Sequence, residues 1–192
     1  MNIRTAGNLL VCAAVLFTGC AASIAQKIID EPYQHKNISV SLNITKIEVG
    51  DARTTVDTAA LTIPSFAFKT ERDTVVPPLT VMEKNEITGE IGRFAKGGDT
   101  KVTVRATVKE GIKQYAKGIM SGREYVRAVV AITLLDSIHQ PDLFSTSGEA
   151  EYEITSTGAD VSSLENLYVK ALKTCVYKAF ESIDEFLEKR QK

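Results

Sequence analysis

The sequence has few of the residues from which disulfide-stapled domains, metal centres and aromatic binding platforms are built. Its 192 residues include three cysteines, two histidines and no tryptophan. Cys12 and Cys20 lie close to the N-terminus, so Cys175 has no partner with which to build a disulfide framework. His35 and His139 lie far apart, and neither has a second ligand at the short spacing of a metal site. We therefore expect no metal, no cofactor and no disulfide.

The sequence also has no large excess of positive or negative charge. The formal net charge is −1, whereas a nucleic-acid-binding domain normally carries a basic patch or stripe. We expect no nucleic acid among the partners. With aromatic residues at 7% and no tryptophan, a carbohydrate-stacking platform is not supported either.

Catalytic constellations are absent from the pattern. Asp136, Ser137 and His139 are the residue types of a hydrolase triad, but triad members normally meet from separate elements rather than within one turn. The glycines at 96–100 lack the spacing of a phosphate-binding loop. We expect no catalytic residues and no enzyme activity.

The only long apolar run is at the N-terminus. Arg4 precedes an apolar stretch from Leu9 to Phe17, which is the charged-then-apolar order of a secretory signal. This run is shorter than the roughly 20 apolar residues that a membrane-spanning helix needs. The pattern therefore predicts a segment that is recognised during export and then removed.

The end of this run, Leu16-Phe17-Thr18-Gly19-Cys20, resembles a bacterial lipobox. The resemblance implies a signal peptide over 1–19 and a mature protein that begins at Cys20. It also implies a diacylglycerol on the Cys20 thiol, and usually a third fatty chain such as palmitate on its amine. Two or more chains hold a protein stably on a membrane. The residues after the cysteine, Ala21-Ala22, resemble an outer-membrane sorting signal.

An alternative reading stays open at this point. Ser23-Ile24-Ala25 also offers small residues where an ordinary signal peptidase would cut. Cleavage after Ala25 would discard Cys20 and release an unanchored protein.

The mature chain is long enough for one domain. We expect a tether over 20–36 and a single periplasmic domain over 37–192. Within it, alternating apolar residues predict a first strand from Ile38, with a β-bulge near Thr45-Lys46 where the alternation slips by one residue. The stretch Gly50-Asp51-Ala52-Arg53 predicts a turn that Asp51 and Arg53 bridge.

Proline and glycine divide the next part of the chain. Pro64 predicts that residues 61–68 form an edge or bent strand. After Pro77-Pro78, apolar residues from Leu79 to Phe94, Met82 among them, recur at helical spacing, and Gly97-Gly98 supplies the stop.

Three further strand patterns follow. Residues 102–108 alternate between apolar and polar side chains, which predicts a strand with one solvent-exposed face. Residues 111–122 are predicted to form a connection. Residues 125–135 are apolar at nearly every position, which predicts a central strand covered on both faces. Residues 145–154 alternate with an acidic solvent face, which is typical of an antiparallel partner.

The last element has the strongest pattern. Ser162 and Glu165 have the spacing of a capping box, and a continuous apolar stripe follows over residues 163–189. Such a helix is long enough to cover a whole sheet. The fold class that we expect is α+β, a mainly antiparallel sheet covered by a middle helix and a long C-terminal helix.

This layout resembles the uncharacterised YajG-type lipoproteins. The resemblance rests on the lipobox, the turn at 50–53, Ser147-Gly148-Glu149 at the third long strand, and the tail Ile183-Asp184-Glu185-Phe186-Leu187. The chain departs from that group in a longer segment between Phe66 and Pro78. More distantly, the order of elements is similar to periplasmic lipoprotein subunits that build rings in secretion systems. Neither resemblance implies a reaction.

The anchor, the complete core and the missing catalytic residues together predict a non-catalytic binding or assembly subunit. We expect it on the outer membrane, facing the periplasm, with other envelope proteins or itself as partner. The candidate interaction surface comprises Asp51, Arg53, Phe66, Phe68, Ile119 and Met120.

Two alternatives remain. The first is a carrier of a lipid or another apolar ligand, with residues 112–120 or 66–68 gating a cavity. The second is an enzyme, which would require a pocket that gathers Asp51, Arg53 and His139.

Overall fold

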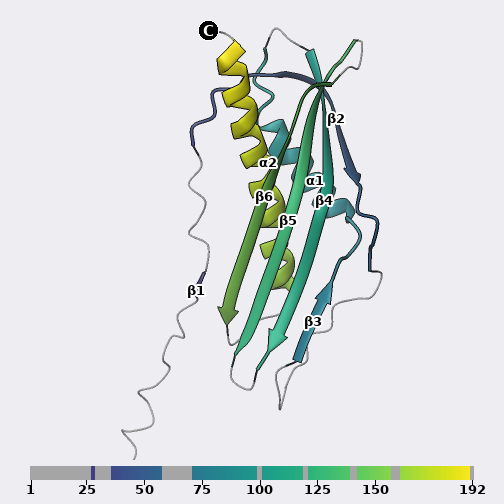
Figure 1. Cartoon of the computed structure of the whole chain (residues 1–192), viewed down its shortest axis with the longest axis vertical. Coiled ribbons are helices and arrows are strands. Elements are labelled where there is room, and N and C mark those ends of the chain that lie inside the picture. The colour runs from purple at the N-terminus through teal and green to yellow at the C-terminus, as the bar shows by residue number, and fades with distance from the viewer. Residues whose placement is uncertain are drawn as a thin grey trace, which may run out of the picture.

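The computed structural model shows one twisted sheet with two helices on the same face (Figure 1). It describes residues 27–28, 36–57, 71–98, 101–118, 121–138, 142–156 and 161–190. In chain order the elements are β1 (Lys27–Ile28), β2 (Asn43–Asp51), β3 (Glu71–Val75), α1 (Val81–Gly92), β4 (Lys101–Lys117), β5 (Gly122–Asp136), β6 (Asp142–Ser156) and α2 (Val161–Arg190). The predicted α+β class is confirmed.

The sheet has the strand order β1-β6-β5-β4-β2, and β3 also pairs with β4. All pairs are antiparallel except that of β2 with β4, which is parallel. Thus β2 and β3 share one edge of β4, one after the other along its length (Figure 1). The sheet is mainly antiparallel, as the alternating patterns predicted.

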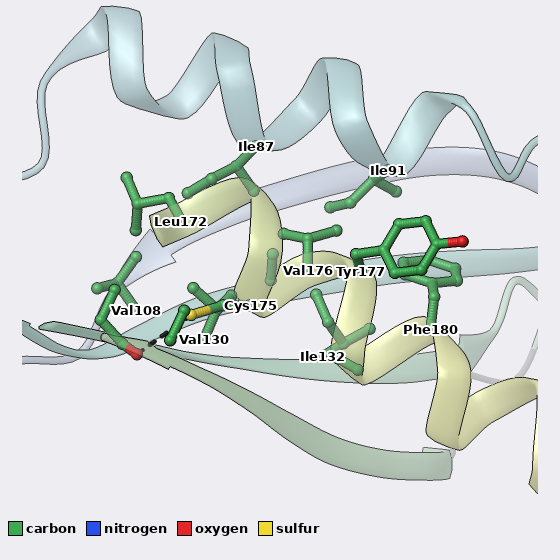
Figure 2. Packing of buried hydrophobic residues seen from close by; sticks show 14 of the residues in the cluster. Ile87, Ile91, Val108, Val130, Ile132, Leu172, Cys175, Val176, Tyr177 and Phe180 are labelled. Carbon is green, nitrogen blue, oxygen red and sulfur yellow. Dashed lines mark hydrogen bonds between the residues drawn. The ribbon is translucent and has the colours of Figure 1, made fainter. Parts of the chain in front are cut away.

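The stripe of α2 faces the sheet and forms the centre of the core, as expected. α2 contacts β5 and β6, and α1 lies beside α2 and over β2. Figure 2 shows Ile87 and Ile91 of α1 pointing toward α2, and Val130 and Ile132 of β5 on the other side of that helix. Phe94 and Phe180 stack with ring centroids 4.1 Å apart. Residues from both helices and the sheet thus belong to one apolar cluster.

Cys175 belongs to this core as a small buried side chain. Its side chain is fully buried, and its Sγ donates a hydrogen bond to the Ala128 carbonyl at 3.1 Å. Burial raises the pKa of the Cys175 thiol to about 12, so the thiol is protonated at neutral pH. A buried and protonated thiol contributes packing rather than reactivity.

The middle helix is confirmed, but its buried face differs from the expected one. Thr80 caps α1: its Oγ1 accepts from the Glu83 amide at 3.2 Å, and its own amide donates to the Glu83 carboxylate at 2.7 Å. This capping box fixes the phase of the first turn. Glu83 is therefore buried, and Met82, which was placed on the apolar face, is 53% exposed.

The predicted connection over 111–122 is wrong. β4 continues to Lys117 and forms a hairpin with β5, which begins at Gly122. A register shift between Val108 and Glu110 interrupts the alternation, and Gly111 and Lys113 take inward positions after it. With a glycine and a lysine on its inner face, this part of the strand lacks the alternation of apolar and polar residues from which a strand is predicted.

Two further predictions are corrected. The outer face of β5 is half-exposed rather than covered, and Arg127 on that face bridges Glu110 and Glu149 of the neighbouring strands. Ser162 does not cap α2, because the helix already begins at Val161. The Glu165 carboxylate contacts Lys113 instead of the helix N-terminus.

The first strand begins later than expected. Residues 36–42 belong to no strand, although Val40 and Leu42 are buried, and β2 starts at Asn43. The predicted bulge is confirmed by a register shift between Ile44 and Lys46. β3 was not predicted, since its five residues, Glu71–Val75, are mostly polar.

Several sequence predictions fall outside the described residues. They are the signal peptide, Cys20, His35, Phe66, Phe68, Ile119, Met120 and His139. Within the ranges that are described, neither helix is long and apolar enough to cross a membrane.

We predict that Gly148→Ala in β6 destabilises the domain, because a Cβ there would overlap the backbone carbonyl of Cys175 in α2. Overpacking of this kind costs about 1–3 kcal/mol. The free energy of unfolding, measured by urea denaturation, tests this. Gly50→Ala in β2 is the control, since a Cβ at Gly50 meets no atom within 4 Å. Equal stability of the two variants would contradict the close helix-to-sheet contact.

Candidate binding site

A β-bulge at Lys109 interrupts β4. Val108 pairs with Val130 and Glu110 with Val129, so Lys109 is the extra residue on the β4 side. Before the bulge the even-numbered residues face the helices, and after it Gly111, Lys113 and Tyr115 do so. Because of the bulge, Lys113 faces the interior, while Lys109, the bulged residue, is exposed.

The same place is an opening in the edge of β4. β2 ends its pairing at Asp51 opposite Val108, and β3 begins at Val75 opposite Lys113. Between them, β4 residues 109–112 pair with no strand of the described chain on that side. A surface pocket of about 230 Å³ lies there, lined by Arg53, Thr54, Thr55, Val76, Lys109, Glu110, Gly111 and Ile112.

Arg53 is held rigidly at this pocket. Its Nε and Nη2 donate to the two carboxylate oxygens of Asp51 at 2.8 and 2.6 Å, and its Nη1 donates to the Gly111 carbonyl at 3.3 Å. The Arg53 side chain is only 4% exposed. These hydrogen bonds lower the pKa of Asp51 and raise that of Arg53. The predicted bridge between Asp51 and Arg53 is therefore confirmed.

Asp51 ties this loop to the middle helix as well. Its Oδ2 accepts from the Leu79 amide at 3.3 Å, next to the N-cap residue Thr80. Further along, the Asp57 amide donates to the Val76 carbonyl at 2.7 Å. The loop after β2 and the segment before α1 therefore run together and form one wall of the pocket.

Glycine is required at the floor of the pocket. A Cβ on Gly111 would overlap the Tyr168 hydroxyl and lie 2.6 Å from Arg53 Nη1. Tyr168 is 1% exposed, and its hydroxyl has no hydrogen-bond partner among the described residues. Burial raises the pKa of Tyr168, so the phenol stays neutral.

A buried ion cluster lies on the inner side of β4. Lys113 Nζ is 3.1 Å from Glu83 Oε1 and 2.5 Å from Glu165 Oε2, and it lies 4.5 Å from the ring centroid of Tyr168. The side chains of Lys113 and Glu83 are 3% and 1% exposed. One ammonium thus connects β4 to the N-terminal parts of both helices. No sequence signal marked this cluster, because its members are 30 and 52 residues apart.

The residues proposed from sequence are only partly brought together. Asp51 and Arg53 meet at the pocket, whereas Phe66, Phe68, Ile119 and Met120 lie outside the described residues. No group of histidine, cysteine, aspartate or glutamate able to hold a metal is found in the described ranges.

A comparison of solved structures finds a protein from Xanthomonas campestris described by the family model DUF330. It has 11% sequence identity and a TM-score of 0.44, over 81% of this chain and 94% of that one. Neither a family model nor a curated protein matches the sequence. At this identity and TM-score the likeness assigns neither a family nor an activity, and the resemblance to YajG-type lipoproteins stays a prediction.

We predict that Lys113→Met destabilises the domain by about 3 kcal/mol, because it leaves the Glu83 carboxylate buried without its cation. Adding Glu83→Gln should recover part of this loss, since the two residues are coupled. Urea denaturation measures both variants. Lys101→Met, on the exposed first residue of β4, is the control and should change stability by less than about 0.5 kcal/mol. Similar losses for both lysines would show that the buried cluster contributes nothing specific.

We also predict that Tyr168→Phe leaves stability unchanged or raises it by up to about 1 kcal/mol, because it removes a buried hydroxyl without a partner. Tyr152→Phe is the matched control. Tyr152 lies in the same core, and its hydroxyl is 2.8 Å from Thr174 Oγ1, so this variant should lose about 1 kcal/mol. Thermal and urea unfolding compare the two. A larger loss for Tyr168→Phe would mean that the hydroxyl is hydrogen-bonded after all.

Proposed function

We propose that this chain is a lipid-anchored lipoprotein of the bacterial outer membrane, and that its α+β domain faces the periplasm as a non-catalytic binding or assembly subunit. The observation that carries the proposal is the sequence Leu16-Phe17-Thr18-Gly19-Cys20 at the end of a short apolar run. The partners would be other envelope proteins or a second copy of the chain.

The entry of the chain into the domain supports this arrangement. The Lys36 amide donates to Glu181 at 3.4 Å, and Tyr177 donates its hydroxyl proton to the Lys36 carbonyl. The Ser39 amide and hydroxyl donate to the Asp184 carboxylate at 3.1 and 2.8 Å. A lipid on Cys20, sixteen residues before Lys36, would therefore be attached to a firmly held point on α2. Because β1 pairs with β6 between these two points, only the residues from Cys20 to Lys27 could extend away from the domain, by at most about 25 Å.

The filled interior favours a binding subunit over the alternative of an apolar-ligand carrier. Side chains from both helices and the sheet pack into one cluster between the described layers (Figure 2). A carrier would require an apolar cavity there. The pocket at the β4 opening lies at the surface and suits contact with a partner.

The described geometry does not favour the enzyme alternative that gathers Asp51, Arg53 and His139. The enzyme alternative needed the turn after β5 to meet Asp51 and Arg53. Ser137 in that turn bonds to the Lys101 carbonyl, at the far end of β4 from Gly111. Ten residues of strand separate these two points, about 33 Å. Ser137 Oγ is 2.7 Å from Thr45 Oγ1, as expected of a structural side chain.

We predict that the protein isolated from its native membranes begins at Cys20 and carries the added mass of a diacylglycerol and a third acyl chain. Cys20→Ala should lose this mass and leave the membrane fraction. Intact mass spectrometry and membrane fractionation measure both properties.

Cys12→Ala is the matched control, because Cys12 lies in the segment that would be removed, and its mature mass should be unchanged. An unmodified chain that begins at Gln26 would refute the anchor and favour the cut after Ala25. Crosslinking of the anchored protein that captures no envelope protein and no second copy would count against the assembly role.

A further inference from the structure

The pocket at the Lys109 bulge has more hydrogen-bond donors than the protein itself uses. A guanidinium has five N–H donors, and Asp51 and Gly111 take three of those of Arg53. The other two belong to a side chain that is 4% exposed and that lines the pocket. Buried donors of this kind normally have an acceptor.

One cation that lines the pocket, Lys109, has no ion-pair partner among the described residues. Arg53 is neutralised by Asp51, and Glu110 lies 3.4 Å from Arg127. Lys109 is exposed and forms no ion pair with any described residue. Arg127 is shared between Glu110 and Glu149, so the pocket has little net positive charge and suits a single negative charge better than a phosphate dianion.

The size and the remaining lining define the rest of the ligand. At about 230 Å³ the pocket is smaller than the roughly 300–1,000 Å³ of sites for drug-sized molecules. Val76 and Ile112 are half-buried and supply apolar surface, and Thr54 and Thr55 add methyl and hydroxyl groups. A short apolar group beside the negative charge fits this lining.

β2 and β3 close the opening in β4 at both ends. A partner strand that paired with β4 here would run into β2 at one end of the opening and into β3 at the other. The end of a chain would have to turn away from the sheet only once, and a small free molecule would not have to turn at all.

We propose that this pocket binds a carboxylate carried on a short apolar group about the size of one amino-acid residue, either the C-terminal residue of a partner or a free small acid. Lys109 and the two remaining N–H groups of Arg53 hold the carboxylate, and Val76 and Ile112 contact the apolar part. This deepens the proposed function, because it rests on a binding role and gives that role a ligand class, but it does not depend on the lipid anchor.

The test is a titration of the full-length chain in lipid nanodiscs, followed by calorimetry or by chemical shifts. N-acetyl-valine represents a C-terminal residue, isovalerate a free acid, and N-acetyl-valinamide the same shape without the charge. We expect saturable binding of N-acetyl-valine in the millimolar range and about tenfold weaker binding of the amide. Binding of isovalerate as tight as that of N-acetyl-valine would assign the site to a free acid, and much weaker binding would assign it to a chain end.

Two variants locate the binding. Lys109→Met should weaken N-acetyl-valine about tenfold and remove the preference over the amide, while Ile112→Ala should weaken both probes alike. Lys96→Met, an exposed lysine after α1, is the control and should change nothing. Equal binding of the acid and its amide, tighter binding of inorganic phosphate, or no effect of Lys109→Met would overturn the proposal.

A Cys20→Ala chain separates this inference from the anchor. If it binds N-acetyl-valine like the unaltered chain, the pocket is independent of lipidation. Loss of membrane attachment with binding retained would then affect only the proposed location, and loss of binding with attachment retained would affect only the pocket.

Discussion

The β-bulge at Lys109 is the constraint on which the rest of the structure depends. One extra residue in β4 changes which side chains face the helices, because side chains alternate strictly along a strand. Without it, Ile112 rather than Lys113 would face inward. With it, Lys113 reaches Glu83 in the first turn of α1 and Glu165 near the start of α2. A single ammonium thereby fixes the ends of both helices against the same strand.

The bulge also lies at the opening in the edge of β4. It coincides with the end of β2 and the approach of β3, so the edge of β4 opens where its own regularity is broken. Gly111 lets Arg53 and Tyr168 approach the strand closely, since a Cβ there would meet both side chains. The buried cluster and the pocket are therefore two consequences of one irregularity, and a change that regularised β4 would affect both.

The two ends of α2 have different contacts. Near its N-terminal third, Tyr168 and Glu165 contact the region of the bulge, and further along, Tyr177 to Asp184 hold the chain where it enters the domain. The two regions lie about 20 Å apart at 1.5 Å per residue. The contacts to the entering chain and those to the buried cluster thus lie along the same helix without overlapping.

The sequence by itself determined those features whose cause is local. The stripe of α2, the alternation of β6, the bulge near Thr45 and the bridge between Asp51 and Arg53 all follow from residues within a few positions of one another. The same local logic failed at 111–122, where Gly111 and Lys113 are unsuitable for an inner face until Tyr168, Glu83 and Glu165 arrive from elsewhere. It failed again at Ser162 and Glu165, because a buried lysine competes with the helix end for the carboxylate. Only the tertiary structure decided the β3 pairing, the buried cluster and the pocket, because the energy of a hydrogen bond or an ion pair depends on distance in space, and the groups that form them here lie tens of residues apart along the chain.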